Sequence, residues 1–155
     1  MSNIGGYVSA IVTKKDTGIS KHVAHLKKNL LTLDGRDLFH AQCYTNTSAG
    51  TRGAGFIAVS SGTTDETSTS TTLQTEIATG GLSRADATTK THTNDSNSST
   101  IEHTFTAGAT HTAVHKSAMF NAASGITMTH VANFTADATL VSGDTLKVTW
   151  TLNLG

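Results

Sequence analysis

The sequence predicts a mainly β protein: an antiparallel β-sandwich or jelly roll with a short helix and an extended amino-terminal arm. The clearest support is the stretch 145–154, where apolar and polar residues alternate without a break, as in a strand with one buried face. Threonine and serine crowd the middle of the chain, and β-branched threonine suits the exposed face of a sheet. Segments with strand patterning also recur between turns after residue 84, as in sandwiches and jelly rolls.

The strand expected at 145–154 is interpreted as a central strand of the core, because its apolar face carries the only tryptophan. The residues just before it, 141–144, form a turn sequence, so we expect a hairpin partner immediately upstream. The predicted core consists of Phe56, Phe105, Phe134, Leu146, Val148, Trp150 and Leu152.

The first third of the chain is expected to stand apart from the sandwich. Residues 7–12 predict a first strand, and the basic turn at 14–18 would close a hairpin or a bend. Residues 20–26 predict a second strand. We therefore expect an arm with strands at 1–33 and a β-sandwich domain at 34–155.

One short helix and a long loop are expected before the later strands. Acidic residues near Asp34 favour the positive end of a helix dipole, which predicts a helix near 35–44. The apolar run 56–60 predicts a buried strand. The threonine-rich stretch 61–72 offers nothing to bury and predicts a surface loop.

The second half is expected to supply most of the sheet. In one of its strands, Ile101, His103 and Phe105 share a face, so the buried side of that strand includes a histidine. The expected strands lie near 84–92, 99–107, 112–120, 127–135 and 145–154.

Composition limits the classes of partner. The chain has 11 Lys and Arg, 11 Asp and Glu, and only 14% charged residues. It therefore lacks the long-range field that attracts nucleic acid or an anionic membrane, and we expect neither as a specific partner. No apolar run reaches membrane-spanning length, and residues 1–6 lack the order of a signal peptide. Cys43 cannot form an internal disulfide and is interpreted as a small buried hydrophobe.

No catalytic or cofactor motif is present, so we expect no enzyme, no cofactor and no metal. Serine occurs in no Gly-x-Ser-x-Gly elbow, and the glycines at 50–55 match neither a phosphate loop nor a dinucleotide fingerprint. The adjacent acids Asp65 and Glu66 have no aromatic sugar platform near them, which argues against glycoside hydrolysis.

The eight histidines raise the alternative of a metal site. Four of them would converge if their strands were neighbours, as a transition metal requires. The nearest acid, Glu102, points to the opposite face from its neighbour, so half-exposed histidines on sheet faces are the favoured interpretation. The four are His103, His111, His115 and His130.

Lysines near the amino terminus form the only local charge asymmetry. The ordinary interpretation is a solvated face; the alternative is contact with an acidic partner surface, or weak contact with nucleic acid. The cluster comprises Lys14, Lys15, Lys21, Lys27 and Lys28.

Several stretches resemble a group of small virion proteins of tailed bacteriophages. These are GFIAVS at 55–60, TTLQTEIATGGLSRA at 71–85, TFTA at 104–107, VHKSAMFNA at 114–122 and SGDTLKVTWT at 142–151. The likeness covers about residues 50–155, and the amino-terminal third more loosely. It implies a structural virion protein that binds and stabilises a phage capsid as a head decoration (cement) protein, assembled in the host cytoplasm. It brings no catalytic residues.

The partners that the resemblance implies are the major capsid protein or other virion subunits, and further copies of the chain, with a trimer favoured. We expect residues 7–12 to be exchanged between subunits or docked on the shell. The alternative is a tail-associated structural module, or one that binds a receptor or carbohydrate; sparse aromatics argue against sugar binding. The candidate contact residues are Tyr7, Val8, Ile11, Lys14 and Lys15.

Overall fold

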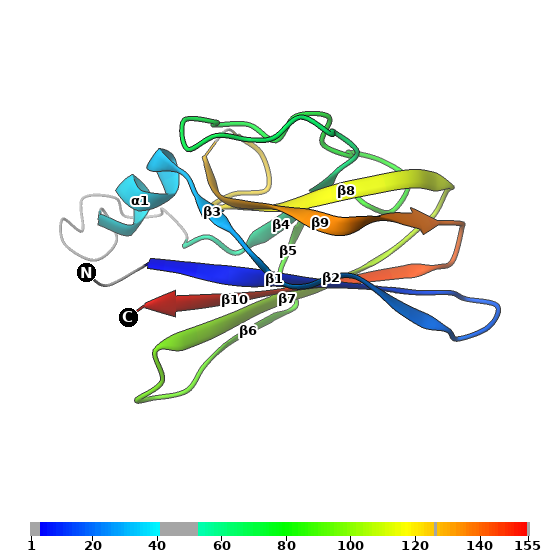
Figure 1. Cartoon of the computed structure of the whole chain (residues 1–155), viewed down its shortest axis with the longest axis horizontal. Coiled ribbons are helices and arrows are strands. Elements are labelled where there is room, and N and C mark those ends of the chain that lie inside the picture. The colour runs from blue at the N-terminus through cyan, green and yellow to red at the C-terminus, as the bar shows by residue number, and fades with distance from the viewer. Residues whose placement is uncertain (1–3, 41–52, 126, 155) are drawn as a thin grey trace.

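The computed structural model describes residues 4–40, 53–125 and 127–154, which form two antiparallel five-stranded sheets packed face to face (Figure 1). The antiparallel β-sandwich predicted from the sequence is confirmed, and the sheets do not close into a barrel. The first sheet has the order β2-β1-β10-β7-β6, with β1 at Ile4–Thr13, β2 at Ser20–Lys28, β6 at Thr89–His92, β7 at Ser98–Thr106 and β10 at Thr145–Leu154. The second has the order β3-β9-β8-β4-β5, with β3 at Leu30–Leu31, β4 at Phe56–Ser60, β5 at Ala85–Asp86, β8 at His111–Phe120 and β9 at Met128–Leu140.

β10 is a central strand, as its alternation predicts. It pairs with β1 on one side and β7 on the other. Leu146, Val148 and Trp150 point between the sheets and are fully buried. The indole Nε1 of Trp150 donates a hydrogen bond of 3.3 Å to the hydroxyl of Ser117 in the second sheet, so the one polar atom of this side chain is satisfied inside the core.

The prediction that β10 forms a hairpin with the strand just before it is wrong. β9 lies in the second sheet and β10 in the first, so the turn at 141–144 carries the chain from one layer to the other. The amide of Gly143 donates to the carbonyl of Ala107 at 2.6 Å, and the Ala107 amide donates to the carbonyl of Asp144 at 2.8 Å. The turn is therefore attached to the end of β7. A turn sequence specifies a reversal of the chain but not the strand that it will join.

The amino-terminal arm predicted at 1–33 is not separate from the sandwich. β1 lies between β2 and β10 and pairs with β10 along its whole length. Val8, Ala10 and Val12 alternate inward and are at most 4% exposed. The predicted domain boundary between residues 33 and 34 is therefore wrong, because a strand that buries three side chains between the sheets belongs to the core.

The predicted core residues lie inside the protein, in two clusters. Phe105, Phe134, Leu146, Val148 and Trp150 belong to the main cluster between the sheets, and Leu152 packs against it partly buried. Phe56 instead belongs to a second cluster on the outer side of the second sheet. The other members of that cluster are Ala58, Leu73, Ala118, Phe120, Met128 and Val131.

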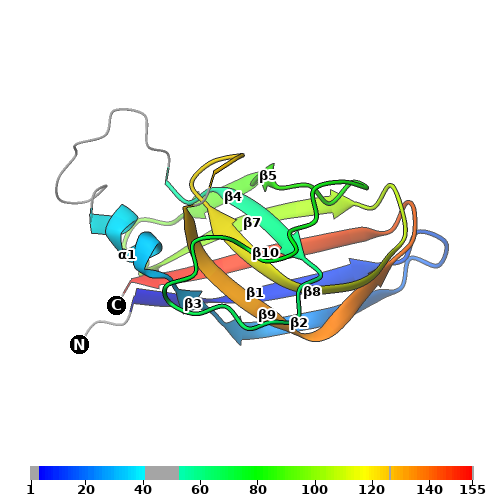
Figure 2. The same ribbon diagram turned by 90° about the horizontal axis from the view of Figure 1, so that it is seen from above.

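Residues 61–84 cover this second cluster. The segment runs across the outer side of the second sheet, which Figure 2 shows from above. It is a loop, as the threonine-rich stretch 61–72 predicts, but the expectation that this stretch buries nothing is wrong. The Glu66 side chain is 4% exposed and lies 3.5 Å from the fully buried ammonium of Lys116, which also donates to the carbonyl of Thr64.

A second group of contacts fixes the end of the same segment. The Arg84 guanidinium lies 3.4 Å from the centre of the Phe120 ring, an attractive position for a cation. It also donates to both carboxylate oxygens of Glu76, at 2.6 and 2.9 Å. The outer side of the second sheet is therefore occupied by the chain itself.

The short helix α1 spans Leu33–His40 and lies against β9. The hydroxyl of Thr32 accepts a hydrogen bond of 3.0 Å from the amide of Gly35, as an N-cap does. A Cβ at Gly35 would lie 2.3 Å from the carbonyl oxygen of Thr129, so only glycine permits this approach. The rest of the helix predicted near 35–44, and Cys43, lie outside the described residues. No helix formed by the described residues has the length and apolar character needed to cross a membrane.

The later strands agree with the pattern in position. β7, β8 and β10 begin and end within about a residue of the expected ranges, and β9 continues to Leu140. The single strand expected at 84–92 is instead two short strands, β5 in the second sheet and β6 in the first.

Candidate functional site

The outer face of the first sheet is a regular surface that the described segments leave free. Alternate residues of β1, β10 and β7 point away from the core and meet in cross-strand rows, such as Tyr7 beside Thr151 and Thr151 beside Thr100. None of the described segments crosses this face, which lies along the lower side of the molecule in Figure 1. We call it the bare face; its residues are Tyr7, Ser9, Ile11, Thr13, Thr100, Glu102, Thr104, Thr106, Lys147, Thr149 and Thr151.

The bare face is hydroxyl-rich along β1, β10 and β7. Lys147 lies 2.9 Å from the carboxylate of Glu102, which also accepts a hydrogen bond of 2.8 Å from the hydroxyl of Thr149. The two charges on β7 and β10 are thus paired with each other, and Lys28 of the neighbouring strand β2 adds a cation beside Tyr7 at the edge of the face. What remains are hydroxyl donors and acceptors on strands about 4.8 Å apart, a spacing suited to contact with an extended surface.

Of the five predicted contact residues, Tyr7 and Ile11 lie on the bare face; Tyr7 is 40% exposed and Ile11 is half-buried. Val8 is fully buried in the core, so its assignment as a subunit or capsid contact is wrong. The reason is the period of the strand, because Val8 points to the opposite face from its neighbour Tyr7.

The lysines of the β1–β2 turn have a structural role that the sequence did not suggest. The Lys14 ammonium lies 2.6 Å from Asp144 and also donates to the carbonyl of Thr139 at 2.8 Å. The amides of Lys15 and Val141 donate to the same carboxylate, each at 2.9 Å. These hydrogen bonds, with that from Lys14 the strongest, lower the pKa of Asp144 to about 2. Asp144 thus joins the two turns at this end of the sandwich, and the Lys15 side chain is exposed.

The four histidines considered as metal ligands do not converge. His111 bonds the carbonyl of Gly80 at 3.0 Å, and the Nδ1 of His115 lies 2.6 Å from the carboxylate of Asp137. His103 packs edge-on against Phe105, and His130 lies inside, 6.2 Å from the Trp150 ring. Within the described ranges, no three His, Cys, Asp or Glu side chains are close enough to share a metal ion.

His130 is expected to make stability depend on pH. Burial lowers its pKa to about 4 from an ordinary value of 6.5. Between these values the unfolded chain binds a proton that the folded protein does not, so stability rises with pH and is lost as pH falls from 6.5 towards 4. The shift corresponds to about 3 kcal/mol. The free energy of unfolding, measured with urea at several pH values, should show this loss.

The His130→Gln variant is the control for this pH dependence. Its unfolding free energy should fall less than that of the wild type across the same interval, with a residual slope because burial also lowers the pKa of His103. Equal slopes for the two proteins would contradict the assignment to His130.

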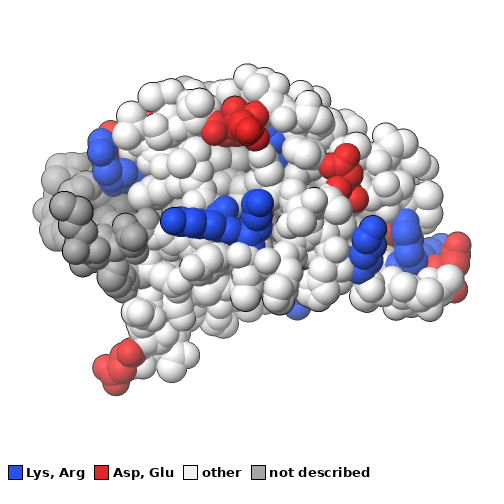
Figure 3. Space-filling model, in the orientation of Figure 1, with Lys and Arg blue, Asp and Glu red and all other residues white. Residues whose placement is uncertain are grey.

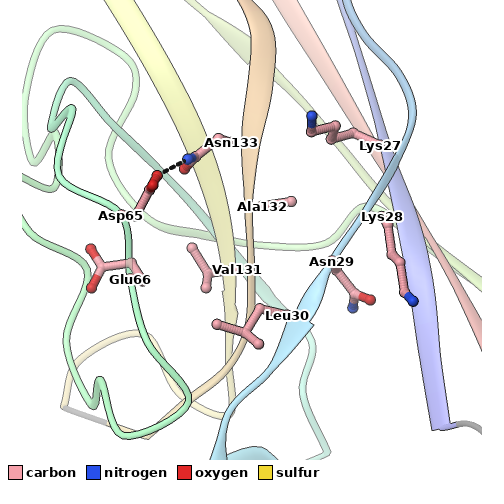
Figure 4. A pocket seen from close by; sticks show the side chains of 9 residues that line it. All are labelled: Lys27, Lys28, Asn29, Leu30, Asp65, Glu66, Val131, Ala132 and Asn133. Atoms are coloured by element: carbon pink, nitrogen blue, oxygen red, sulfur yellow. Dashed lines mark hydrogen bonds between the residues drawn. The ribbon is translucent and has the colours of Figure 1, made fainter.

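A hollow of about 360 Å³ opens at the side of the sandwich, where the chain passes from β2 to β3 (Figure 4). Asp65 lies on one side of it and accepts a hydrogen bond from the amide group of Asn133 in β9. Lys27 lies on the other, and Leu30 and Val131 form apolar lining. Sequence reasoning missed this hollow, because it combines three segments that are distant in the chain.

Comparison of the chain with protein-family models, with curated proteins and with solved structures finds no match. The class of protein therefore follows from the structure itself. It is a β-sandwich in which residues 61–84 cover one outer sheet face, while no described segment covers the other.

Proposed function

We propose that this protein is a structural component of a bacteriophage particle, which docks on the capsid shell as a decoration (cement) protein and stabilises it. The observation that carries the proposal is the difference between the two outer faces. The second sheet is covered by residues 61–84, whereas the first is rich in hydroxyl groups and free of described cover. A protein that works by covering a broad surface needs such a face.

The chemistry of the bare face supports docking over turnover. A stable interface buries about 800 Å² on each partner, which a sheet face supplies and a small cleft does not. Tyrosine is enriched at the centre of interfaces, and Tyr7 is the aromatic side chain that stands on this face. Beside it on β10 and β7, threonine hydroxyls can donate to and accept from polar groups of a shell.

The proposed partner is the major capsid protein, with other virion subunits and further copies of this chain as additional contacts. The protein would be assembled in the host cytoplasm and retained in the virion. The exchange of residues 7–12 between subunits is not proposed again, because β1 is an inner strand of its own sandwich. Deletion of residues 1–18 would remove this inner strand. A loss of binding would then report on folding and not on the contact itself.

The proposal predicts that two further positive charges in the bare face weaken docking. Tyr7→Arg combined with Thr151→Arg places two cations side by side in one cross-strand row. Each guanidinium would lose its hydration at the interface without gaining a carboxylate partner. We therefore expect the affinity for shells that lack the protein, measured by co-sedimentation, to fall more than about tenfold. Circular dichroism confirms that the variant is folded.

The matched control places the same two charges on the covered side. Thr71 and Thr72 are exposed residues of the loop over the second sheet. Thr71→Arg with Thr72→Arg should bind shells like the wild type. Loss of binding in this control, or retention in the bare-face variant, would refute docking through the bare face.

The alternative function is a tail-associated structural, receptor-binding or carbohydrate-binding module on the same sandwich. Trp150 is fully buried and unavailable to stack on a sugar, which weighs against glycan recognition. A glycan array and an adsorption assay on host cells separate the two proposals. Specific binding to a glycan or to host cells, together with normal stability of shells that lack the protein, would favour the alternative.

A further inference from the structure

The side of the sandwich between β2 and β9 carries a second unoccupied surface, distinct from the bare face. β2 is the edge strand of the first sheet, and β9 has a partner on its outer side only where β3 pairs with His130 and Val131. We call the side along β2 and β9 the seam. It contains the hollow of about 360 Å³ at Lys27 and Asp65, and another of about 240 Å³ at Lys21 and Asp137.

Apolar side chains are exposed along the seam. Ile19, next to β2, is 65% exposed, the highest value of any large hydrophobic among the described residues, and it lines the smaller hollow. Leu30 of β3 is 37% exposed and lines the larger hollow. Scattered apolar residues need no explanation, but exposed apolar side chains that line two hollows along one edge are typical of a contact surface.

The charges of the seam are sorted into two rows. Figure 3 looks onto this side: lysines lie along β2, and acids lie above them on the second-sheet side. Lys21 and Lys27 pair in register with the inward residues Val12 and Val8, which turns both lysines towards the seam. Asp65 and Asp137 stand opposite, each lining the same hollow as one of these lysines.

The lysine row is not neutralised within the chain. Across the described residues, no carboxylate lies within 4 Å of the ammonium groups of Lys21, Lys27 or Lys28. The lysines would attract an acidic partner or a nucleic acid, but the carboxylates of Asp65 and Asp137 would repel it. A ligand of a single sign therefore fits only half of the seam.

We propose that the seam binds the seam of a second copy of this chain, in a two-fold symmetric pair. A two-fold axis parallel to the seam places the lysine row of each copy against the acid row of the other, so that Lys27 faces the second copy's Asp65 and Lys21 faces its Asp137. Isologous interfaces require such a self-complementary patch. The exposed apolar residues Ile19 and Leu30 are then covered between the two copies.

The pair is held by side chains and not by a continuous β-sheet. β2 is irregular in register with β1, and Leu26 has a φ of +48°, which places a bulge in the edge. Bulges and inward-pointing lysines on an edge strand prevent another strand from adding to it. The two seams therefore meet through charged and apolar side chains, with closed symmetry and no growth into fibres.

Exchanging the charges tests the pairing. Lys27→Glu and Asp65→Lys each place like charges together, and so do Lys21→Glu and Asp137→Lys. Each single change is expected to raise the dimer dissociation constant at least about tenfold in sedimentation equilibrium. The combinations Lys27→Glu/Asp65→Lys and Lys21→Glu/Asp137→Lys reverse the pattern and should restore the dimer. Lys90→Glu, on the opposite edge of the sheet, is the control and should leave it unchanged.

A wild type that stays monomeric up to about 100 µM would overturn the proposal. So would a trimeric mass, failure of both combinations to restore a dimer that the single changes weaken, or a complex that disappears with nuclease. Circular dichroism of each variant separates loss of pairing from loss of folding. The inference does not rest on docking to a shell, because the bare face stays free in the pair; either proposal can fail alone.

Discussion

Replacement of Trp150 by alanine is expected to lower the free energy of unfolding by about 3–5 kcal/mol. The indole is fully buried between the two sheets and is one of the largest side chains of the main core cluster. Alanine would leave a cavity there and remove the hydrogen bond that the indole donates to the Ser117 hydroxyl. Urea unfolding followed by circular dichroism measures the loss, since the variant has no tryptophan left for fluorescence.

The neighbouring residue Thr151 provides the matched control for Trp150. It lies on the same strand but points to the bare face. Thr151→Ala should change stability by no more than about 0.5 kcal/mol. Similar losses in the two variants would show that Trp150 is not the central core side chain of the sandwich.

Replacement of Glu66 by alanine is expected to cost about 3–5 kcal/mol, because it leaves the buried charge of Lys116 without its carboxylate. Lys116 is fully buried in β8, and Glu66 reaches it from the loop over the second sheet. Unpairing this charge should also loosen the loop itself. Urea unfolding gives the cost, and hydrogen exchange of residues 61–84 should show faster exchange than in the wild type.

The double variant Lys116→Met/Glu66→Leu separates the pair from the packing around it. Without either charge, nothing remains to be desolvated, so most of the lost stability should return. The exposed pair Lys90–Asp86 is the control, and Asp86→Ala should cost at most about 1 kcal/mol. If Glu66→Ala is as mild as Asp86→Ala, the buried pair does not hold the loop.

The strands could be predicted because their periodicity is local. The alternation at 145–154 and the apolar run at 56–60 each specify a strand without reference to any other part of the chain. The inward residues of β10 follow directly from that period. The same reasoning located β7 and β8, and it placed a histidine on the inner side of β7.

What could not be predicted depends on which strands meet. The arm and the hairpin were wrong for one reason: β10 pairs with β1, at the opposite end of the sequence, and not with the strand just before it. Predicting Val8 as a contact residue depends on treating residues 1–33 as an arm, whereas the period of β1 places Val8 inside.

The surfaces were hidden for a similar reason. Neither the bare face nor the seam exists until the strands are ordered in their sheets. No local pattern joins Glu66 to Lys116, or Asp65 to Asn133, since each contact spans a loop and a distant strand. The lysine cluster was visible in the sequence, but the acids opposite it were not.

The most direct test of the account is an electron cryo-microscopy map of particles carrying the protein. Docking through the bare face predicts that β1, β10 and β7 lie against the shell, with residues 61–84 pointing away from it. A map in which residues 61–84 contact the shell and the outer face of the first sheet is turned to solvent would contradict it.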